Sequence, residues 1–484
     1  MYKNKLFTLL KRLDRKEMTR FREFVTSPYF NKHKDVITLV EYLDKLYPDF
    51  NEKNCDRKRI YPLLFGQVQH NQSQLAIVFT YTKRLLEHFL VVEKQQDIVL
   101  SQHVFLLQQL RQKEQYKLYD KQLQTTQTWL HQHASQDADF QYASYRIAKE
   151  TDRYYEQLRE YKSDDSLQQK QNFLDRFYLS EKLRDACEML VRQITLQVNY
   201  ASHLLSALLE EVDQKWNYYK QIPSIAVYYE IYQMLQKSTK EAYQQALKRV
   251  SENAHYFSQQ EQQSIYQYLQ NYCTAQVNKG QSTYLRDWFD LTRLQLEKGL
   301  LFEQAHLPEW HYKNLVTIGL RLGEKKWVSH FIESYKIHLH PDHQAHAYAF
   351  NLATYHYYQK EYDQVLSLLC YLDISDVRYN ISAKSMLLCT YYELQEEEAL
   401  LALSDAFKQY LKRQQTVSAN YETSMENLVK YTRKLSLLRS KLVYEKKEKL
   451  NSSFHKLKQA ILKEDNIFNK DWLVTKLEEI AVGK

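Results

Sequence analysis

Residues 353–369 read ATYHYYQKEYDQVLSLL, and residues 387–403 read LLCTYYELQEEEALLAL. The two stretches share a tyrosine doublet and several apolar positions at an offset of 34 residues. The matched residues are Ala353, Tyr357, Tyr358, Leu366 and Leu369 with Leu387, Tyr391, Tyr392, Leu400 and Leu403. About 34 residues make a helix–turn–helix unit, which buries its apolar face by stacking on copies of itself. The spacing therefore predicts an all-α, elongated helical-repeat fold, an α-solenoid.

Residues that interrupt helices are scarce in this chain. There are six Gly and six Pro in 484 residues, with no Gly between Gly66 and Gly280 and no Pro between Pro62 and Pro223. Folds built from many tight turns need the positive φ angles that Gly supplies. A hydrophobic content of 44%, with 41 Tyr and 20 Phe, provides material for a continuous core. Composition therefore favours a folded, helical chain.

The cysteines and the apolar segments indicate where the chain resides. The five cysteines are widely spaced and form no C-x-x-C pair, which fits reduced thiols. Near the start, only residues 6–10 are apolar, too few for the core of a signal peptide. No stretch approaches the roughly 18 apolar residues of a membrane span. We therefore expect a soluble cytoplasmic protein with no integral membrane segment; its net charge of +8 is mild for this length.

Breaks in the pattern divide the chain into four regions. They are an N-terminal helical module (1–95), a long-helix middle region (96–215), helical repeats (216–413) and basic C-terminal helices that cap the array (414–484). In the middle region, apolar residues recur at three and four, which predicts amphipathic helices. From Leu183 to Val212 this rhythm allows one long helix or two with a slight bend. Coiled-coil pairing is the alternative, but the stripe lacks a sustained Leu/Ile seam.

After Pro223 the helices shorten and capping signals appear. Ser238-x-x-Glu241 and Ser258-x-x-Glu261 have the spacing of capping boxes, in which side chains satisfy the free amides at a helix start. Glycines stand where helix C-termini are expected, at Gly280, Gly299 and Gly323.

Residues 312–413 contain three helix pairs by this pattern. In the first two, Ile318, Trp327 and Phe331 precede Ala353, Tyr362 and Leu366 at an offset of 35. The period, the paired helices and the aromatic residue in the first helix resemble the tetratricopeptide superfamily. The resemblance implies a groove that holds a peptide or protein segment. The sequence departs from the family motif at Leu366 and Leu400, where a small residue is usual, and no proline ends a unit. The alternative is an irregular helical domain.

A second resemblance concerns residues 27–46, SPYFNKHKDVITLVEYLDKL. This segment is similar to the N-terminal region of large, uncharacterised all-helical bacterial proteins. The resemblance implies a helical fold and no particular activity.

Four histidines are clustered in residues 338–346, HLHPDHQAH. They are His338, His340, His343 and His346. His343 and His346 would share one helix face, and neutral imidazole is a common ligand of transition metals. However, no Cys and only Asp342 accompany them nearby. We therefore expect solvated histidines around the turn at Pro341, keep a metal as the weaker alternative, and predict no cofactor.

The C-terminal region is basic and amphipathic. Residues 430–463 contain eleven Lys or Arg and two acids. Such a helix binds phosphates, an anionic surface or an acidic partner, or it packs on the last repeat with its lysines in solvent. We favour the packed helix. The lysines that would contact an anion or nucleic acid are Lys441, Lys446, Lys447, Lys449, Lys456 and Lys458.

The sequence favours a binding function over catalysis. It contains no phosphate-binding G-x-x-x-x-G-K-[ST], no G-x-G-x-x-G and no H-E-x-x-H motif. We expect a non-enzymatic scaffold or adaptor that binds a peptide or protein segment in the groove of the repeats. The candidate contact residues are Tyr357, Tyr358, Tyr391 and Tyr392, for which packing in the core is the ordinary alternative. The competing hypothesis is a nucleic-acid-binding or regulatory protein that uses the basic C-terminal helices.

Overall fold

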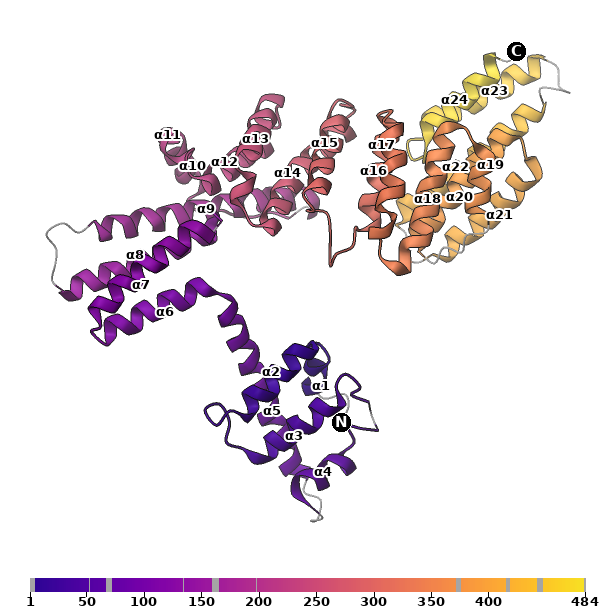
Figure 1. Cartoon of the computed structure of the whole chain (residues 1–484). Helices are drawn as coiled ribbons and strands as arrows, with labels where there is room; N and C mark the ends of the chain where they lie inside the picture. The colour runs from indigo at the N-terminus through magenta and orange to yellow at the C-terminus, as the bar shows by residue number, and fades with distance from the viewer. Residues whose placement is uncertain are drawn as a thin grey trace. The chain divides into compact units, whose positions relative to one another are not determined.

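The computed structural model describes residues 5–51, 53–66, 72–133, 135–158, 165–196, 198–370, 376–414, 418–441 and 447–482. Within these ranges the regular elements are 24 α-helices and two short 3-10 helices, and the sole β-type contact is an isolated bridge between Glu303 and His306. The prediction of an all-α chain is confirmed (Figure 1). Across these residues no helix combines the length and the apolar character needed to cross a membrane.

The chain divides into two compact units. The first comprises Met1–Glu188 and Tyr200–Ala226, and the second comprises Met189–Asn199 and Val227–Lys484.

The first unit begins with five helices around one aromatic-rich core. They are α1 (Lys5–Leu10), α2 (Arg15–Thr26), α3 (Lys34–Leu46), α4 (Arg57–Phe65) and α5 (Gln72–Asp97). Asp14 starts α2 with a capping box, in which its carboxylate accepts the Glu17 N–H while the Glu17 carboxylate accepts the Asp14 N–H. Phe7 packs against Phe50 and Phe79, and all three are buried. Ser27-Pro28 and Tyr47-Pro48 lie in the turns that connect these helices.

Longer helices follow in the first unit. They are α6 (Val99–Gln112), α7 (Tyr116–His133), α8 (Ala138–Leu158), α9 (Ser166–Leu196), α10 (Leu205–Gln214) and α11 (Trp216–Tyr219). The unit boundary falls within α9. The rhythm from Leu183 to Val212 is not one helix or a slightly bent one, because residues 198–204 are non-helical. Leu204, the residue that precedes α10, has a φ of 65°, a left-handed conformation that an α-helix does not contain.

The second unit contains helices arranged in sequential pairs. After α12 (Pro223–Lys237) and α13 (Lys240–Asn253), the pairs are α14 (Gln259–Asn278) with α15 (Tyr284–Glu297), α16 (Glu309–Arg321) with α17 (Lys325–Tyr335), α18 (Pro341–Gln359) with α19 (Tyr362–Leu369), and α20 (Val377–Leu394) with α21 (Glu397–Arg413). The last helices are α22 (Ala419–Lys441), α23 (Lys447–Lys463) and α24 (Lys470–Val482). The 3-10 helices are η1 (Ala254–Tyr256) and η2 (Lys336–His338).

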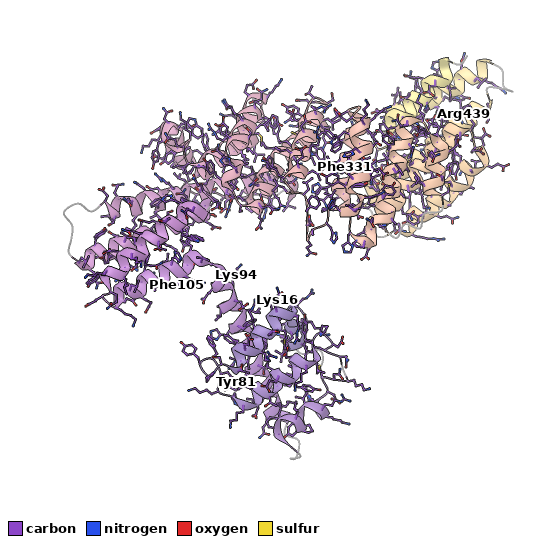
Figure 2. All side chains as sticks on the ribbon, viewed as in Figure 1. Lys16, Tyr81, Lys94, Phe105, Phe331 and Arg439 are labelled. Atoms are coloured by element: carbon purple, nitrogen blue, oxygen red, sulfur yellow. The ribbon has the colours of Figure 1, made fainter. Side chains whose placement is uncertain are left out.

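The pairs contact one another in a regular way. The first helix of one pair packs on the first helix of the next, α16 on α18 and α18 on α20, and α20 packs on α22. Each second helix also contacts the following first helix, from α15 and α16 to α21 and α22 (Figure 1). Buried aromatic and aliphatic residues fill these contacts. Phe331 of α17, labelled in Figure 2, stacks on Trp327 with ring centroids 5.0 Å apart.

The predicted capping signals of the second unit can be compared with its helix ends. Ser258 begins α14, and its hydroxyl accepts the Glu261 N–H as predicted. Ser238 does not begin α13, because it has a φ of 50° and Thr239 takes the capping position instead. The three expected glycines do follow helix C-termini with positive φ angles, at Gly280, Gly299 and Gly323.

The C-caps of α18 and α20 determine the spacing between the pairs α18–α19 and α20–α21. Lys360 ends α18 and Gln395 ends α20, both in the left-handed conformation with φ angles of 62° and 64°. In both turns the next N–H closes the same hydrogen bond, from Glu361 to His356 O and from Glu396 to Tyr391 O, each 3.0 Å. The structural step between these pairs is therefore 35 residues, one more than the offset of the matching letters.

Candidate functional site

Two of the clustered histidines lie on the first turns of α18. Pro341 occupies the first turn, and the Nδ1 atom of His340 accepts the Asp342 N–H at 3.3 Å. Because α18 starts here, His343 and His346 are three residues apart on one helix face, as the sequence predicts. Their ring centroids are 5.4 Å apart.

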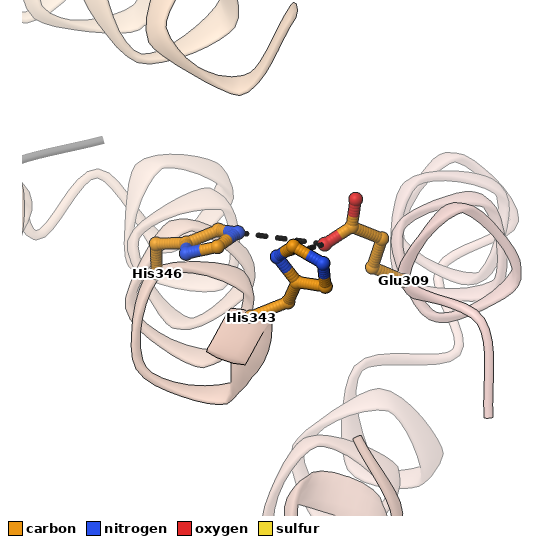
Figure 3. Close-up of side chains that lie close together, drawn as sticks. All are labelled: Glu309, His343 and His346. Atoms are coloured by element: carbon orange, nitrogen blue, oxygen red, sulfur yellow. Dashed lines mark ion pairs between the residues drawn. The ribbon is translucent and has the colours of Figure 1, made fainter. Parts of the chain in front are cut away.

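A carboxylate from another helix joins these two histidines. Glu309 is the first residue of α16, which packs beside α18. Its Oε2 atom lies 3.4 Å from His346 Nε2 and 4.0 Å from His343 Nδ1 (Figure 3). One ligand-type atom from each of the three side chains lies within 4.8 Å of the other two. Glu309 is not among the residues predicted from the sequence, and its place in the cluster follows from the packing of α16 against α18.

The cluster is partly shielded from water. The His346 side chain is 8% exposed and the Glu309 side chain is 26% exposed. Both His346 Nε2 and Glu309 Oε2 are buried atoms that make no hydrogen bond. Polar atoms in such surroundings normally have a partner, so the pair is an unusual feature of this core.

Tyr379 of α20 borders the cluster. Its hydroxyl donates to the backbone oxygen of Glu309 at 3.0 Å, and its ring meets the His346 ring edge-on with centroids 5.5 Å apart. Burial raises the pKa of Tyr379, so the hydroxyl stays protonated and keeps its donor role at neutral pH. The start of α16 is thus held by the start of α20.

The other two predicted histidines lie outside this cluster. His340 lines a cavity of about 590 Å³ together with His306, Glu309 and His343. His338 belongs to η2, where its ring meets Phe302 and its backbone oxygen accepts the Leu307 N–H at 2.8 Å. The structure therefore brings His343 and His346 together, places His340 at the cavity and leaves His338 outside both.

A half-buried lysine lies on the same helices. Lys313 of α16 donates to Ser382 Oγ at 3.0 Å, and its ammonium lies over the rings of Phe350 and Tyr379 at 5.1 and 5.3 Å. Burial lowers the pKa of Lys313, while the charge of Asp376 acts in the opposite direction. This side chain therefore contacts the first helices of the next two pairs, α18 and α20.

The four candidate tyrosines differ in exposure. Tyr392 is buried, and the ring of Tyr357 is half-buried with its hydroxyl inside the core. Tyr391 is half-buried, with its hydroxyl 3.4 Å from Cys370 Sγ. Tyr358 is the exposed member, at 41%. Their burial leaves Tyr358 best placed to contact a partner directly, while the others lie mainly in the packing between helices.

The six candidate lysines are also unevenly placed. Lys446 lies outside the described residues, and for Lys447 the backbone alone is described, at the start of α23. Lys449 is exposed, and Lys458 lies 3.9 Å from Glu478. Lys441 and Lys456 lie on the two sides of a groove between α22 and α23.

The α22–α23 groove is a cavity of about 300 Å³ between these two helices. Its lining residues are Lys434, Leu437, Leu438, Lys441, Ser453, Lys456, Leu457 and Ala460. Leu438 and Leu457 are buried, whereas Leu437 is 51% exposed. The groove thus combines an apolar floor with three lysines. These lysines come from two helices, both within the basic amphipathic region predicted from the sequence.

The first unit contains a larger cavity, of about 680 Å³, bordered by α7, α8 and α9. Gln141 and Ser144 of α8 line it, and both are 4% exposed. Gln141 Oε1 and Ser144 Oγ make no hydrogen bond. Arg176 at its edge donates to the Tyr218 hydroxyl at 2.7 Å. This cavity offers polar atoms without partners but no titratable cluster.

No family model matches the chain, and neither a curated protein nor a solved structure matches it.

Proposed function

We propose that this chain is a non-enzymatic protein-interaction scaffold whose second unit is an α-solenoid of the tetratricopeptide kind. In this proposal the C-terminal end of the array holds an acidic protein segment with an apolar anchor. The observation that carries it is the α22–α23 groove, in which exposed Leu437 lies among Lys434, Lys441 and Lys456. The protein would act in the cytoplasm, as the cysteine pattern predicts.

The groove has the chemistry that an acidic amphipathic segment requires. An apolar side chain from the partner would rest on Leu437, Leu438 and Leu457, and this burial would supply most of the affinity. Carboxylates beside that anchor would meet the lysines, which favours acidic partners and accelerates encounter. Both walls are formed helices, so binding orders little of the scaffold itself.

The packing of the second unit supports the solenoid part of the proposal. The first helices α16, α18, α20 and α22 contact one another in sequence. Arrays of this kind leave a continuous surface along their first helices, and the last helices cover the end of the core. Here α22 packs against α23 and α24, and Leu435, Leu450 and Leu473 are buried among them.

Nucleic-acid binding by the basic C-terminal helices is the second candidate. The observation in its favour is the convergence of Lys434, Lys441 and Lys456 on one groove. Phosphate contacts release counterions, so this candidate predicts affinity that falls steeply with salt and that depends on the lysines alone. It gives Leu437 no role.

Matched variants in a capture experiment separate the two candidates. The tagged full-length protein would be used to capture partners from native lysate at moderate salt, with half of each sample treated with nuclease. The variants are Leu437→Gln and the double variant Lys434→Gln/Lys456→Gln. The control is Leu462→Gln on α23, because Leu437 and Leu462 are equally exposed, at 51%, and Leu462 is not part of the groove.

We expect a protein partner that survives nuclease and is lost in both groove variants but not in Leu462→Gln. Capture that disappears with nuclease, is lost in the lysine variant and is unchanged in Leu437→Gln would contradict the scaffold proposal and support nucleic-acid binding.

A further inference from the structure

We propose that Glu309, His343 and His346 bind a divalent transition-metal ion, with one face of the ion open to the cavity beside α18. This site is independent of the α22–α23 groove. Two imidazoles and one carboxylate are a ligand set that zinc and other first-row divalent ions accept. Three protein ligands leave at least one coordination position for water or another molecule.

The separations between the side chains match such an ion. Bonds of about 2.0–2.2 Å to nitrogen and oxygen place neighbouring ligand atoms of a tetrahedral site roughly 3.4 Å apart. Glu309 Oε2 lies 3.4 Å from His346 Nε2 and 4.0 Å from His343 Nδ1 (Figure 3). All three ligand-type atoms fall within 4.8 Å of one another, so small side-chain rotations complete the site.

The buried atoms of the cluster favour a bound cation. His346 is nine-tenths buried, and its Nε2 and the Oε2 of Glu309 make no hydrogen bond although they are 3.4 Å apart. A simple histidine–carboxylate ion pair would be expected to close a hydrogen bond at that distance. An ion between the two nitrogens and the shared oxygen satisfies all three atoms at once.

Neighbouring groups fix the ligands and leave an approach. Tyr379 holds the backbone of Glu309 by its 3.0 Å hydrogen bond and packs against the His346 ring, which restricts both ligands. On the other side, His343 and Glu309 line the cavity of about 590 Å³ together with His306 and His340. Water or a small anionic ligand could reach the open position from there.

The test is a titration of the metal-depleted full-length protein with Zn²⁺, followed by calorimetry, and with Co²⁺, followed by its visible absorption. The variants are Glu309→Gln and His343→Gln, whose side chains are 26% and 49% exposed. The matched control is His338→Gln, from the same histidine-rich stretch but outside the cluster. Circular dichroism confirms that each variant is folded.

We expect one tight Zn²⁺ site per chain and intense Co²⁺ bands, with affinity at least about tenfold weaker in both cluster variants. The His338→Gln protein should bind like the wild type. The proposal is overturned if no ion binds stoichiometrically, or if binding is unchanged in Glu309→Gln and depends on His338, which would mark a surface histidine cluster only.

Discussion

The helix pairs α18–α19 and α20–α21 share the same tyrosine doublet, yet the doublets are not structurally equivalent. When the two pairs are aligned by their C-caps at Lys360 and Gln395, Tyr357 is equivalent to Tyr392. Alignment by the tyrosine doublets would instead make Tyr357 equivalent to Tyr391, one position earlier. In this register Val365 and Leu400 are also equivalent, and both are fully buried. The comparison teaches that the helix cap, and not the identical letter, determines which residues of the two helix pairs play the same role.

The shift of one residue has consequences for the surface. Tyr391 stands where the first pair has His356, and the place of exposed Tyr358 is taken by Glu393. The carboxylate of Glu393 accepts the Trp472 Nε1–H at 2.9 Å and lies 3.0 Å from Lys476 Nζ. The second pair therefore uses this position to attach α24, while the first pair leaves an aromatic ring partly exposed there.

The largest expected effect is the loss of stability when Tyr392, the buried equivalent of Tyr357, is replaced. Tyr392→Ala should lower the free energy of unfolding by about 3–5 kcal/mol, because it empties a core position that is 2% exposed. Tyr358→Ala should lower it by less, about 1 kcal/mol, because its side chain is already 41% exposed. Urea denaturation measures both values. Equal losses would mean that the doublets are equivalent by letter, contrary to the register given by the caps.

The next effect concerns the cation that covers Tyr392. The guanidinium of Arg439, labelled in Figure 2, lies 4.0 Å from the Tyr392 ring centroid and donates to the Tyr392 backbone oxygen at 2.5 Å. Arg439→Ala should destabilise by about 1–3 kcal/mol. Arg433→Ala on the same helix removes an exposed pair with Asp405 and should cost less than about 1 kcal/mol. Thermal unfolding of the two variants provides the comparison, and similar losses would argue against the Arg439 contact.

A smaller effect tests the caps themselves. Lys360→Gly and Gln395→Gly should each stabilise by about 0.5–1 kcal/mol, because glycine adopts a φ near 63° without steric strain. The gains should be similar at both sites, since both turns close the same hydrogen bond. Gln359→Gly, one residue earlier in α18, should instead destabilise by up to about 1 kcal/mol. Higher stability for Gln359→Gly and lower stability for Lys360→Gly would mean that α18 is capped one residue earlier. The step between the two pairs would then not be 35 residues.

The smallest effect is chemical and leaves the fold unchanged. Cys370, just after α19, is exposed, whereas Cys389 of α20 is buried and its pKa is raised to about 12 by burial. Iodoacetamide at pH 8 should therefore label Cys370 first and leave Cys389 unmodified until the protein unfolds. Mass spectrometry of a labelling time course identifies the order. Early labelling of Cys389 would show that the interior of the α20–α21 pair is open.

The sequence predicts the elements of this fold better than their register. Scarce Gly and Pro indicate helices, and Ser258 and Gly323 mark real helix ends, because these signals act locally. Lys360 and Gln395 end helices without glycine, so the sequence contains no local signal for the cap that sets the step. The two matching tyrosine doublets therefore predict a step of 34 residues, one residue shorter than the step between the caps.

The candidate sites divide in the same way. His343 and His346 share a helix turn and are predictable from their spacing. Glu309 is 34 residues upstream of His343, and its approach depends on how α16 packs against α18. Likewise Lys434 and Lys456 converge because two helices fold against each other, which a linear count of basic residues does not reveal.

A photo-crosslinking amino acid in place of Leu437 tests the role of the α22–α23 groove most directly. The modified full-length protein would be irradiated in cells, with the same replacement of Leu462 as the control, and its adducts analysed after nuclease treatment. We predict discrete protein adducts at position 437, in acidic segments of the partner, and few at position 462. Adducts to nucleic acid at 437, or the same pattern at both positions, would contradict a protein-binding groove.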